Sequence, residues 1–166
     1  MQPGKKEDRE FTADMTPPLR ETLLSDRDPE SRRRAALELG AAGGDSAIAA
    51  LLRALKDPEK DVRAAAAQAL ASIGPAAIGP LAAALGDEGW VVRYRAAEAL
   101  GSIRDARSVT ALIRALGDGR DHVRYMAAKG LGNLGERNAI GPLTAALADE
   151  NEFVRRAARE ALAVLG

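Results

Sequence analysis

The chain has 166 residues, of which 46% are hydrophobic, 29% are charged and only 3% are aromatic, and its formal net charge is zero. A core of Ala, Leu, Ile and Val suits closely packed helices better than sheets, and the length fits one domain. The lack of cysteine excludes thiol catalysis, disulfides and zinc–thiolate sites, and the balanced charge argues against a protein that coats nucleic acid.

The first segment, residues 1–16, is charged and has no apolar pattern, which predicts a disordered tail. It lacks the apolar stretch of a secretory signal, and no apolar run approaches the roughly 20 residues that span a bilayer. We therefore expect a cytoplasmic protein with no membrane contact. Residues 17–25 follow, with Leu19, Leu23 and Leu24 spaced as on one face of a short helix, which predicts a helix that caps the rest of the domain.

A unit of about 31 residues then repeats to the end of the chain. Each copy has an Asp, an Arg six residues later and, in a further seven residues, a Leu. The arginines are spaced by 31, 30, 31 and 31 residues, and the missing residue of the second unit falls in the turn between its two halves. The predicted repeats are 26–56, 57–86, 87–117, 118–148 and a partial 149–166.

Each unit is typical of two helices. In the second unit, Asp57 resembles an N-cap, Val62 and Leu70 lie on one helical face, and Gly74 marks the end of the first helix. The second helix is shorter and has a proline near its start, at Pro80 in this unit. A small residue follows each key leucine and indicates close helix approach: Gly40, Ala71, Gly101, Gly132 and Ala163.

Neither helix of a unit can bury its apolar stripe alone, so the units must stack on one another. The sequence therefore predicts an all-α fold, a right-handed α-solenoid of about five helical hairpins with a concave and a convex face. The last helix has no successor, and Ala158, Leu162 and Leu165 are expected to be partly exposed. A partner, a homodimer contact through this C-terminal helix or a longer parent chain would cover them.

The units "DEGWVVRYRAAEALGSIRDARSVTALIRALG" and "DGRDHVRYMAAKGLGNLGERNAIGPLTAALA" resemble HEAT-like repeats of the phycobilisome-lyase type. The resemblance covers roughly residues 26–166, and it implies that the first helix of each unit lines the concave surface. Members of that family include bilin lyases, metal-dependent hydroxylases and scaffold proteins, so the resemblance specifies the fold and leaves the function open.

Helical geometry places the remaining positions of the first helices away from the core. All aromatic residues except Phe11 fall there, together with several charged residues. An exposed cluster of Trp, Tyr and Arg has the composition of a protein-binding hot spot, whereas the alternative is that the rings fill grooves between alanine-rich helices. The predicted partner-binding residues are Trp90, Tyr94, Arg95, Glu98, His122, Tyr125, Met126, Lys129 and Phe153.

The regular arginines and aspartates fit a structural role instead. An Arg beside the core stripe can bond a neighbouring Asp or the carbonyls at a helix end. The expected structural ladder consists of Asp57, Arg63, Asp87, Arg93, Asp118, Arg124, Asp149 and Arg155.

Catalysis has little support in the sequence. His122 is the only histidine, so the His-Glu doublets of the hydroxylases are missing, and we expect no metal and no cofactor. A non-catalytic scaffold that binds a protein partner of unknown identity is the favoured function. A bilin lyase or chaperone-like subunit is the second hypothesis, and weak nucleic-acid binding is the third, through Arg33, Arg34, Arg95, Lys129 and Arg156.

Overall fold

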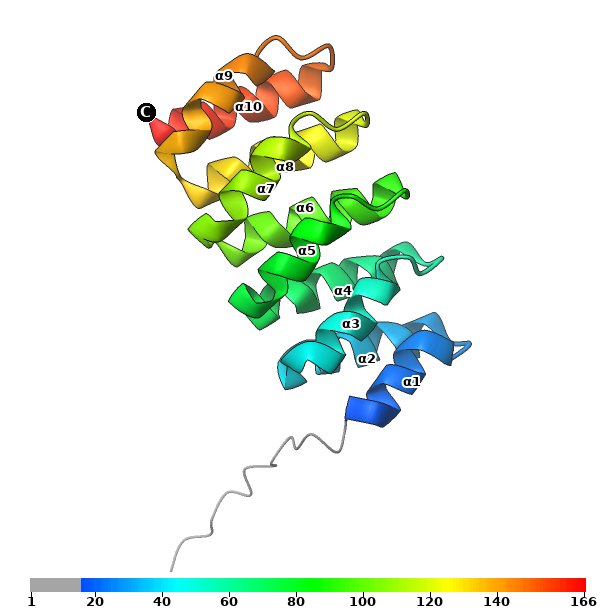
Figure 1. The fold of residues 1–166 in the computed structure, drawn as a ribbon. Helices are drawn as coiled ribbons and strands as arrows, with labels where there is room; N and C mark the ends of the chain where they lie inside the picture. Colours follow the sequence, from blue (N-terminus) through cyan, green and yellow to red (C-terminus); the bar gives the residue numbers. More distant parts are fainter. Residues whose placement is uncertain (1–15) are drawn as a thin grey trace, which may run out of the picture.

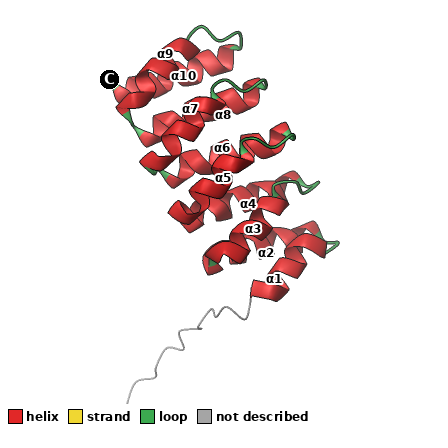
Figure 2. Cartoon of the chain, viewed as in Figure 1, coloured by secondary structure: helices red, strands yellow, loops and turns green. Residues whose placement is uncertain are grey.

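A computed structural model describes residues 16–166, which form helices joined by short turns (Figures 1 and 2). The predicted tail lies outside the described residues, except that Thr16 begins the first helix one residue before the predicted capping helix. The elements are α1 (Thr16–Ser25), α2 (Pro29–Ala42), α3 (Gly44–Ala54), α4 (Lys60–Ile73), η2 (Gly74–Ala77), α5 (Ile78–Ala84), α6 (Trp90–Ile103), η3 (Ala106–Ser108), α7 (Val109–Ala115), α8 (Asp121–Leu134), η4 (Arg137–Ala139), α9 (Ile140–Ala146) and α10 (Glu152–Leu165).

The helices form two layers, which confirms the predicted all-α solenoid. The first helices of the units, α2, α4, α6, α8 and α10, stack in one layer, and the second helices lie in front of them in Figure 1. Each second helix packs more extensively on the first helix of the following unit than on the first helix of its own unit. The capping helix α1 takes the same place in front of α2, so every first helix has a partner.

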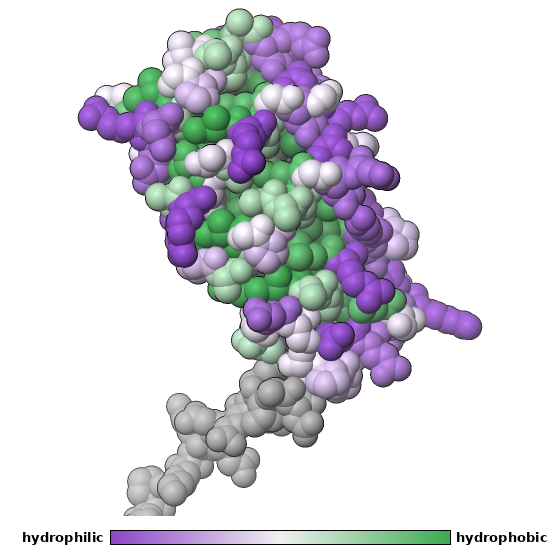
Figure 3. All heavy atoms as spheres, viewed as in Figure 1, coloured by the Kyte–Doolittle hydropathy of each residue, from purple (hydrophilic) through white to green (hydrophobic). Residues whose placement is uncertain are grey.

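The apolar stripe of the first helices forms the centre of the core. Val62, Ala66 and Leu70 of α4 are fully buried, and Leu100 and Leu131 occupy the position of Leu70 in the next two units. Each buried Val or Leu side chain contributes about 1.5–3 kcal/mol relative to exposure. Hydrophilic residues gather along the edge that carries the loops between units (Figure 3).

One segment, Lys60–Ala84, is long and apolar enough to cross a membrane by length and composition, contrary to the expectation that no run approaches that length. In the structure it is interrupted at η2 and folds into two helices of the second unit. Among its large apolar side chains, Val62, Leu70 and Leu81 are fully buried against neighbouring helices, and Ile73 is half-buried. Its apolar character is therefore accounted for by the core.

The predicted N-cap at Asp57 is wrong, because α4 begins three residues later, at Lys60. The carboxylate of Asp57 accepts a hydrogen bond from the N–H of Glu59 in the turn before the helix, and it pairs with Arg32 of the preceding unit. Asp87 bonds the N–H of Gly89 in the same way. The repeated Asp therefore shapes the loop between units rather than the first turn of the helix.

The first helices end as the glycines predict. Gly74 and Gly135 adopt positive φ angles of 79° and 69° at the ends of α4 and α8. At the end of α6 the corresponding residue is Arg104, with φ 55° in the left-handed region. A side chain in this region costs roughly 1–2 kcal/mol, so α6 ends with local backbone strain.

Arg104→Gly is therefore expected to raise the free energy of unfolding by about 1 kcal/mol, since glycine adopts this conformation at little cost. Urea denaturation followed by circular dichroism at 222 nm measures the change. The matched control is Gly135→Ala, which places a side chain in the same conformation at the end of α8 and should lower the free energy of unfolding by a similar amount. Equal stabilities for all three proteins would contradict the strain at Arg104.

The small residues after the key leucines allow first helices to approach closely, as predicted, at three of the five positions. A Cβ added at Gly40 would lie 2.7 Å from the Cβ of Ala69, and one at Gly101 would lie 2.5 Å from the Cα of Gly130. A Cβ added at Gly132 would lie 3.0 Å from Ala161. The other two small residues differ, because Ala71 is partly exposed and Ala163 is exposed.

The arginine–aspartate ladder connects three of the four pairs of successive units. Arg93 donates from Nε and Nη2 to both carboxylate oxygens of Asp118, at 2.7 and 2.9 Å, and the pairs Arg32–Asp57 and Arg124–Asp149 repeat this geometry. Hydrogen bonds from Arg124 hold the pKa of the Asp149 carboxyl below its usual value. Arg63 does not form the corresponding pair with Asp87, because the second unit is one residue short, and Asp87 pairs with Lys56.

The expected exposure of the last helix is only partly correct. Ala158 and Leu165 are buried against α8 and α9, and Leu162 is half-buried. The large apolar side chains that α10 leaves exposed are instead Val164, at 69%, and Phe153, at 51%.

Candidate functional site

The outward surface of α6, α8 and α10 carries the aromatic residues, and we call it the aromatic stripe. It consists of Trp90, Tyr94, His122, Tyr125 and Phe153. Trp90 and Tyr94 share one side of α6, and His122 and Tyr125 share one side of α8, because an α-helix places positions three or four residues apart on the same side. Trp90, Tyr94 and Tyr125 are half-buried, whereas His122 and Phe153 are exposed.

Contacts between units join the rings across the stripe. The ring centroids of Trp90 on α6 and His122 on α8 are 5.4 Å apart with planes tilted by 51°. Tyr94 on α6 is partly desolvated, and burial raises the pKa of its phenol. The contact of Trp90 with His122 therefore connects the rings of α6 and α8.

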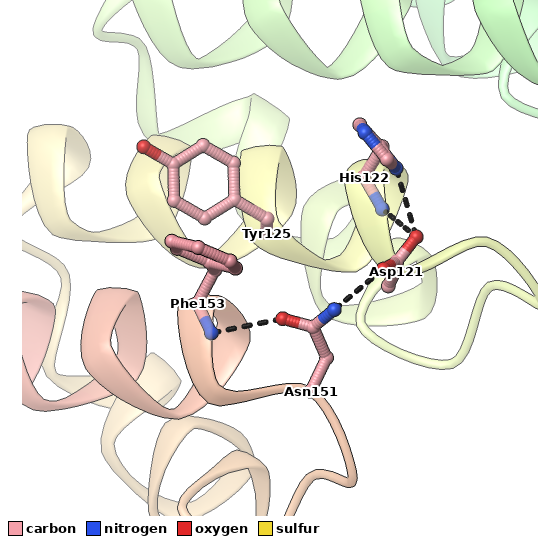
Figure 4. A pocket seen from close by; sticks show the side chains of 5 residues that line it. All are labelled: Asp121, His122, Tyr125, Asn151 and Phe153. Carbon is pink, nitrogen blue, oxygen red and sulfur yellow. Dashed lines mark hydrogen bonds and ion pairs between the residues drawn. The ribbon is translucent and has the colours of Figure 1, made fainter.

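A recess of about 170 Å³ opens between the start of α8 and the start of α10 (Figure 4). The rings of Tyr125 and Phe153 form one side, and His122, Asp121 and Asn151 form the other. Asn151 donates from Nδ2 to Oδ2 of Asp121, and its own Oδ1 accepts from the N–H of Phe153. This chain of hydrogen bonds fixes the polar wall, so the recess is largely pre-formed.

A cation accompanies each ring of the stripe except His122. The guanidinium of Arg95 lies 5.3 Å from the ring centroid of Tyr94, and that of Arg120 lies 5.8 Å from the ring of Trp90. Lys129 and Arg156 hold similar positions over Tyr125 and Phe153. Aromatic groups with adjacent cations offer both a wide contact area and directional polar contacts, as in protein-binding hot spots.

Met126 does not belong to this surface, contrary to the prediction. Its side chain is 9% exposed and packs in the core, as do Ala65 and Ala157 at the same position of their units. The position is thus buried in the second, fourth and fifth units, whereas Arg34 holds it in the first unit and is exposed. Arg95 holds it in the third unit, where only 16% of its side chain is exposed, and its Nη1 bonds Glu98 at 2.7 Å.

Sequence reasoning missed three residues at the site. Arg120 and Asn151 each lie directly before a helix, where a helical pattern assigns no side, and Asp121 is the first residue of α8. The periodicity of the units could have found the first two. They occupy the third position of their units, and that position adjoins the outward residues of the neighbouring first helix.

The remaining predicted residues lie at the edges of the stripe. Glu98 is half-exposed and neutralises Arg95, while Lys129 is exposed beside Tyr125. His122 bonds Asp121 through Nδ1 at 2.8 Å, and this bond holds the pKa of the Asp121 carboxyl below its usual value. Within residues 16–166, no group of three or more His, Cys, Asp or Glu side chains is placed to hold a metal ion.

Comparisons with known proteins agree with this architecture. A family model described as HEAT repeats matches residues 16–91 and 78–163. A search of curated proteins gives no match. Among solved structures, the chain is similar to the complex of CpcE and CpcF of phycocyanin lyase from Nostoc sp. PCC7120, with 28% identity, a TM-score of 0.64, and coverage of 98% of this chain and 70% of that chain.

Two further solved structures have lower TM-scores. An engineered protein is 26% identical, with a TM-score of 0.56 and coverage of 91% of this chain and 79% of that one. Human deoxyhypusine hydroxylase is 20% identical, with a TM-score of 0.56, and the shared regions are 93% of this chain and 74% of the hydroxylase. At that identity the hydroxylase shows a common fold alone.

Proposed function

Because the chain belongs to the HEAT repeat family, whose stacked helices present extended surfaces to other proteins, we propose that it is a non-catalytic scaffold that binds a protein partner through the aromatic stripe. The main support for this proposal is that the aromatic stripe has members on three successive first helices, α6, α8 and α10. A single half-buried ring is explained by local packing, whereas a row of rings with a pre-formed recess exposes more apolar area than folding requires.

The chemistry of the stripe supports a polypeptide as the partner. Trp90, Tyr125 and Phe153 offer flat apolar area at low entropy cost, and their neighbouring cations supply hydrogen-bond donors for carbonyl and carboxylate groups. The recess beside Tyr125 has room for one side chain of a partner. The similar lyase protein is itself a complex of two chains, which is consistent with a protein partner here.

The variant Trp90→Ala, Tyr125→Ala is expected to weaken partner binding by about 30-fold or more, or roughly 2 kcal/mol, because both rings are anchors of the proposed surface. The partner is first recovered from native lysate with the unaltered chain, and its affinity for each variant is then measured by titration calorimetry. Arg114→Ala, on the exposed side of α7, is the matched surface control and should leave binding unchanged.

Circular dichroism must show native helicity in both variants. If the double variant is folded and binds the recovered partner as tightly as the unaltered chain, the aromatic stripe is not the binding surface. Loss of binding in the Arg114→Ala variant alone would instead place the interface on the second helices.

A lyase or chaperone-like subunit that handles a bilin is the second candidate, favoured by the similarity to the phycocyanin lyase complex. An aromatic surface of this kind can stack on the extended ring system of such a pigment. Mixing the protein with a bilin should then shift the visible absorption spectrum, and the double variant should reduce the shift. An unchanged spectrum at saturating protein concentration excludes this role.

A further inference from the structure

The contact between the second and third units differs from the other three contacts between successive units. Arg63 and Asp87 are separated by 24 residues, whereas the three ladder pairs are separated by 25. The packing of α4 on α6 is the least extensive among the successive first helices. Ala71 stands here where the third unit has Gly101, so this junction lacks the close glycine approach of its neighbour.

The three formed ladder pairs show what the arginine of each unit is arranged to bind. Each guanidinium uses Nη1 for the backbone carbonyl that lies six residues earlier, and turns its Nε–Nη2 edge towards the next unit. That edge holds both oxygens of one carboxylate, as in Arg124 with Asp149 at 2.7 and 2.9 Å. The planar fork of a guanidinium matches a carboxylate in this bidentate way.

Arg63 is held in the same orientation but lacks this acceptor. Its Nη1 donates to the carbonyls of Asp57 and Pro58, at 2.6 and 2.7 Å. Its Nε is shielded from solvent and has no hydrogen-bond partner within residues 16–166. Asp87, which the repeat would place there, bonds Lys56 at 2.6 Å instead. A shielded donor without an acceptor destabilises the folded chain, so an acceptor that reaches it is favoured.

A recess of about 510 Å³ lies at this junction, and Arg63 forms part of its wall. Arg63 is the cation of this recess whose charge is not balanced by an ion pair among the described residues. Asp57 is paired with Arg32, and Asp87 is paired with Lys56. Glu88 is exposed at the rim and is the one lining carboxylate for which no ion pair forms among the described residues.

We propose that this recess is a carboxylate-binding site, in which a carboxylate from outside the chain binds the Nε–Nη2 edge of Arg63. At the other three junctions the same edge of the arginine binds Asp57, Asp118 or Asp149. The carboxylate belongs to a small organic acid or to an acidic side chain of a polypeptide, since both present the same group. The site lies apart from the aromatic stripe and does not depend on the function proposed for it.

The test follows the Nε–Hε signals of the arginines by ¹H–¹⁵N NMR, with Arg63 assigned by the loss of its signal in Arg63→Lys. Sodium acetate is added in increasing amounts while sodium chloride is removed, so that the ionic strength stays constant. A second titration uses the capped peptide acetyl-Ala-Asp-Ala-amide in place of acetate. Arg63 should shift saturably with the carboxylates and not with chloride. The signals of Arg32, Arg93 and Arg124 should stay in place, because their edges are filled.

A capped peptide that binds at least tenfold more tightly than acetate identifies a polypeptide side chain as the ligand, and equal affinities identify a free carboxylate. Glu88→Gln should tighten acetate binding several-fold by removing the opposing charge, whereas Arg63→Lys should weaken it at least tenfold, as measured through the neighbouring amide signals. Arg155, for which the described residues provide no carboxylate partner, is the control for nonspecific contact.

Two results overturn the proposal. One is a shift of Arg63 that is absent, or no larger than that of Arg155, over the whole titration. The other is an Nε–Hε signal of Arg63 that, in the free protein, already lies with those of Arg32, Arg93 and Arg124 and that shifts in the Asp87→Asn variant. Asp87 would then itself occupy the Nε–Nη2 edge of Arg63.

Discussion

Gly101→Ala is expected to lower the free energy of unfolding by about 3 kcal/mol, although alanine is the better helix former by about 1 kcal/mol. The reason is the crossing of α6 and α8, where an added Cβ at Gly101 would lie 2.5 Å from the Cα of Gly130. Neither partner has a flexible side chain that can move aside, so the two helices must separate. Urea denaturation followed by circular dichroism measures the loss.

The distances at the other crossings predict the order of the effects. Gly40→Ala meets Ala69 at 2.7 Å and should cost less than Gly101→Ala, while Gly132→Ala meets Ala161 at 3.0 Å and should cost least. The control is Gly141→Ala, because a Cβ at Gly141 has nothing within 4 Å. It should be neutral or stabilising by up to about 1 kcal/mol. A Gly101→Ala protein as stable as this control would show that the crossing is not tight.

Separation of α6 from α8 at this crossing would affect the whole interface between the third and fourth units. Units of a solenoid contact only their neighbours, so the stability of the whole depends on each interface between units. The interface of α6 with α8 lies between the third and fourth units, and both of these carry the aromatic stripe. Its loss would therefore divide the proposed binding surface, whereas damage at α2 would leave that surface intact.

The framework of the fold could be predicted because it repeats. Five copies of one pattern reveal the core stripe, the helix ends and the small residues at crossings, and Leu70, Gly74 and Gly101 occupy the expected places. A feature that depends on the spacing between units was harder to predict. The Arg63–Asp87 pair fails because one residue is absent from the second unit, and the effect on the geometry of two side chains required the structure.

The candidate site was predictable to the extent that it follows helical geometry. An α-helix has one core side, so Trp90 and Tyr94 could be assigned to the outward side from their spacing. A first helix of a solenoid also contacts the helices of the previous and next units, and a single helical pattern does not identify those sides. Met126 is buried for this reason, and Arg95 is mostly covered.

Arg124→Met is expected to lower the free energy of unfolding by about 3 kcal/mol at neutral pH. The side chains of Arg124 and Asp149 are each only 10% exposed, and their bidentate pair joins the fourth unit to α10. Methionine preserves much of the packing but leaves the Asp149 carboxylate without its guanidinium in a partly buried place. Urea denaturation gives the loss, and Arg155→Met is the matched control.

Arg155 has the same position in its unit and donates to the carbonyls of Asp149 and Glu150, but it forms no ion pair with an aspartate among residues 16–166. Arg155→Met should thus lose only those backbone contacts, about 1 kcal/mol. A loss as large as that of Arg124→Met would mean that the ladder stabilises through the loop carbonyls and not through the ion pair between units.

The pH dependence separates the ion pair from simple packing. The hydrogen bonds from Arg124 lower the pKa of Asp149 in the folded chain, so the pair contributes stability above the unfolded pKa of about 4, and this contribution is lost as the pH falls through the lower folded value. Acidification therefore destabilises the unaltered chain more than Arg124→Met, in which the Asp149 carboxyl binds its proton more readily. The difference between the two proteins should shrink from pH 7 towards pH 3. A difference that stays constant over this range would assign the loss to packing of the arginine side chain, because packing does not depend on the charge of Asp149.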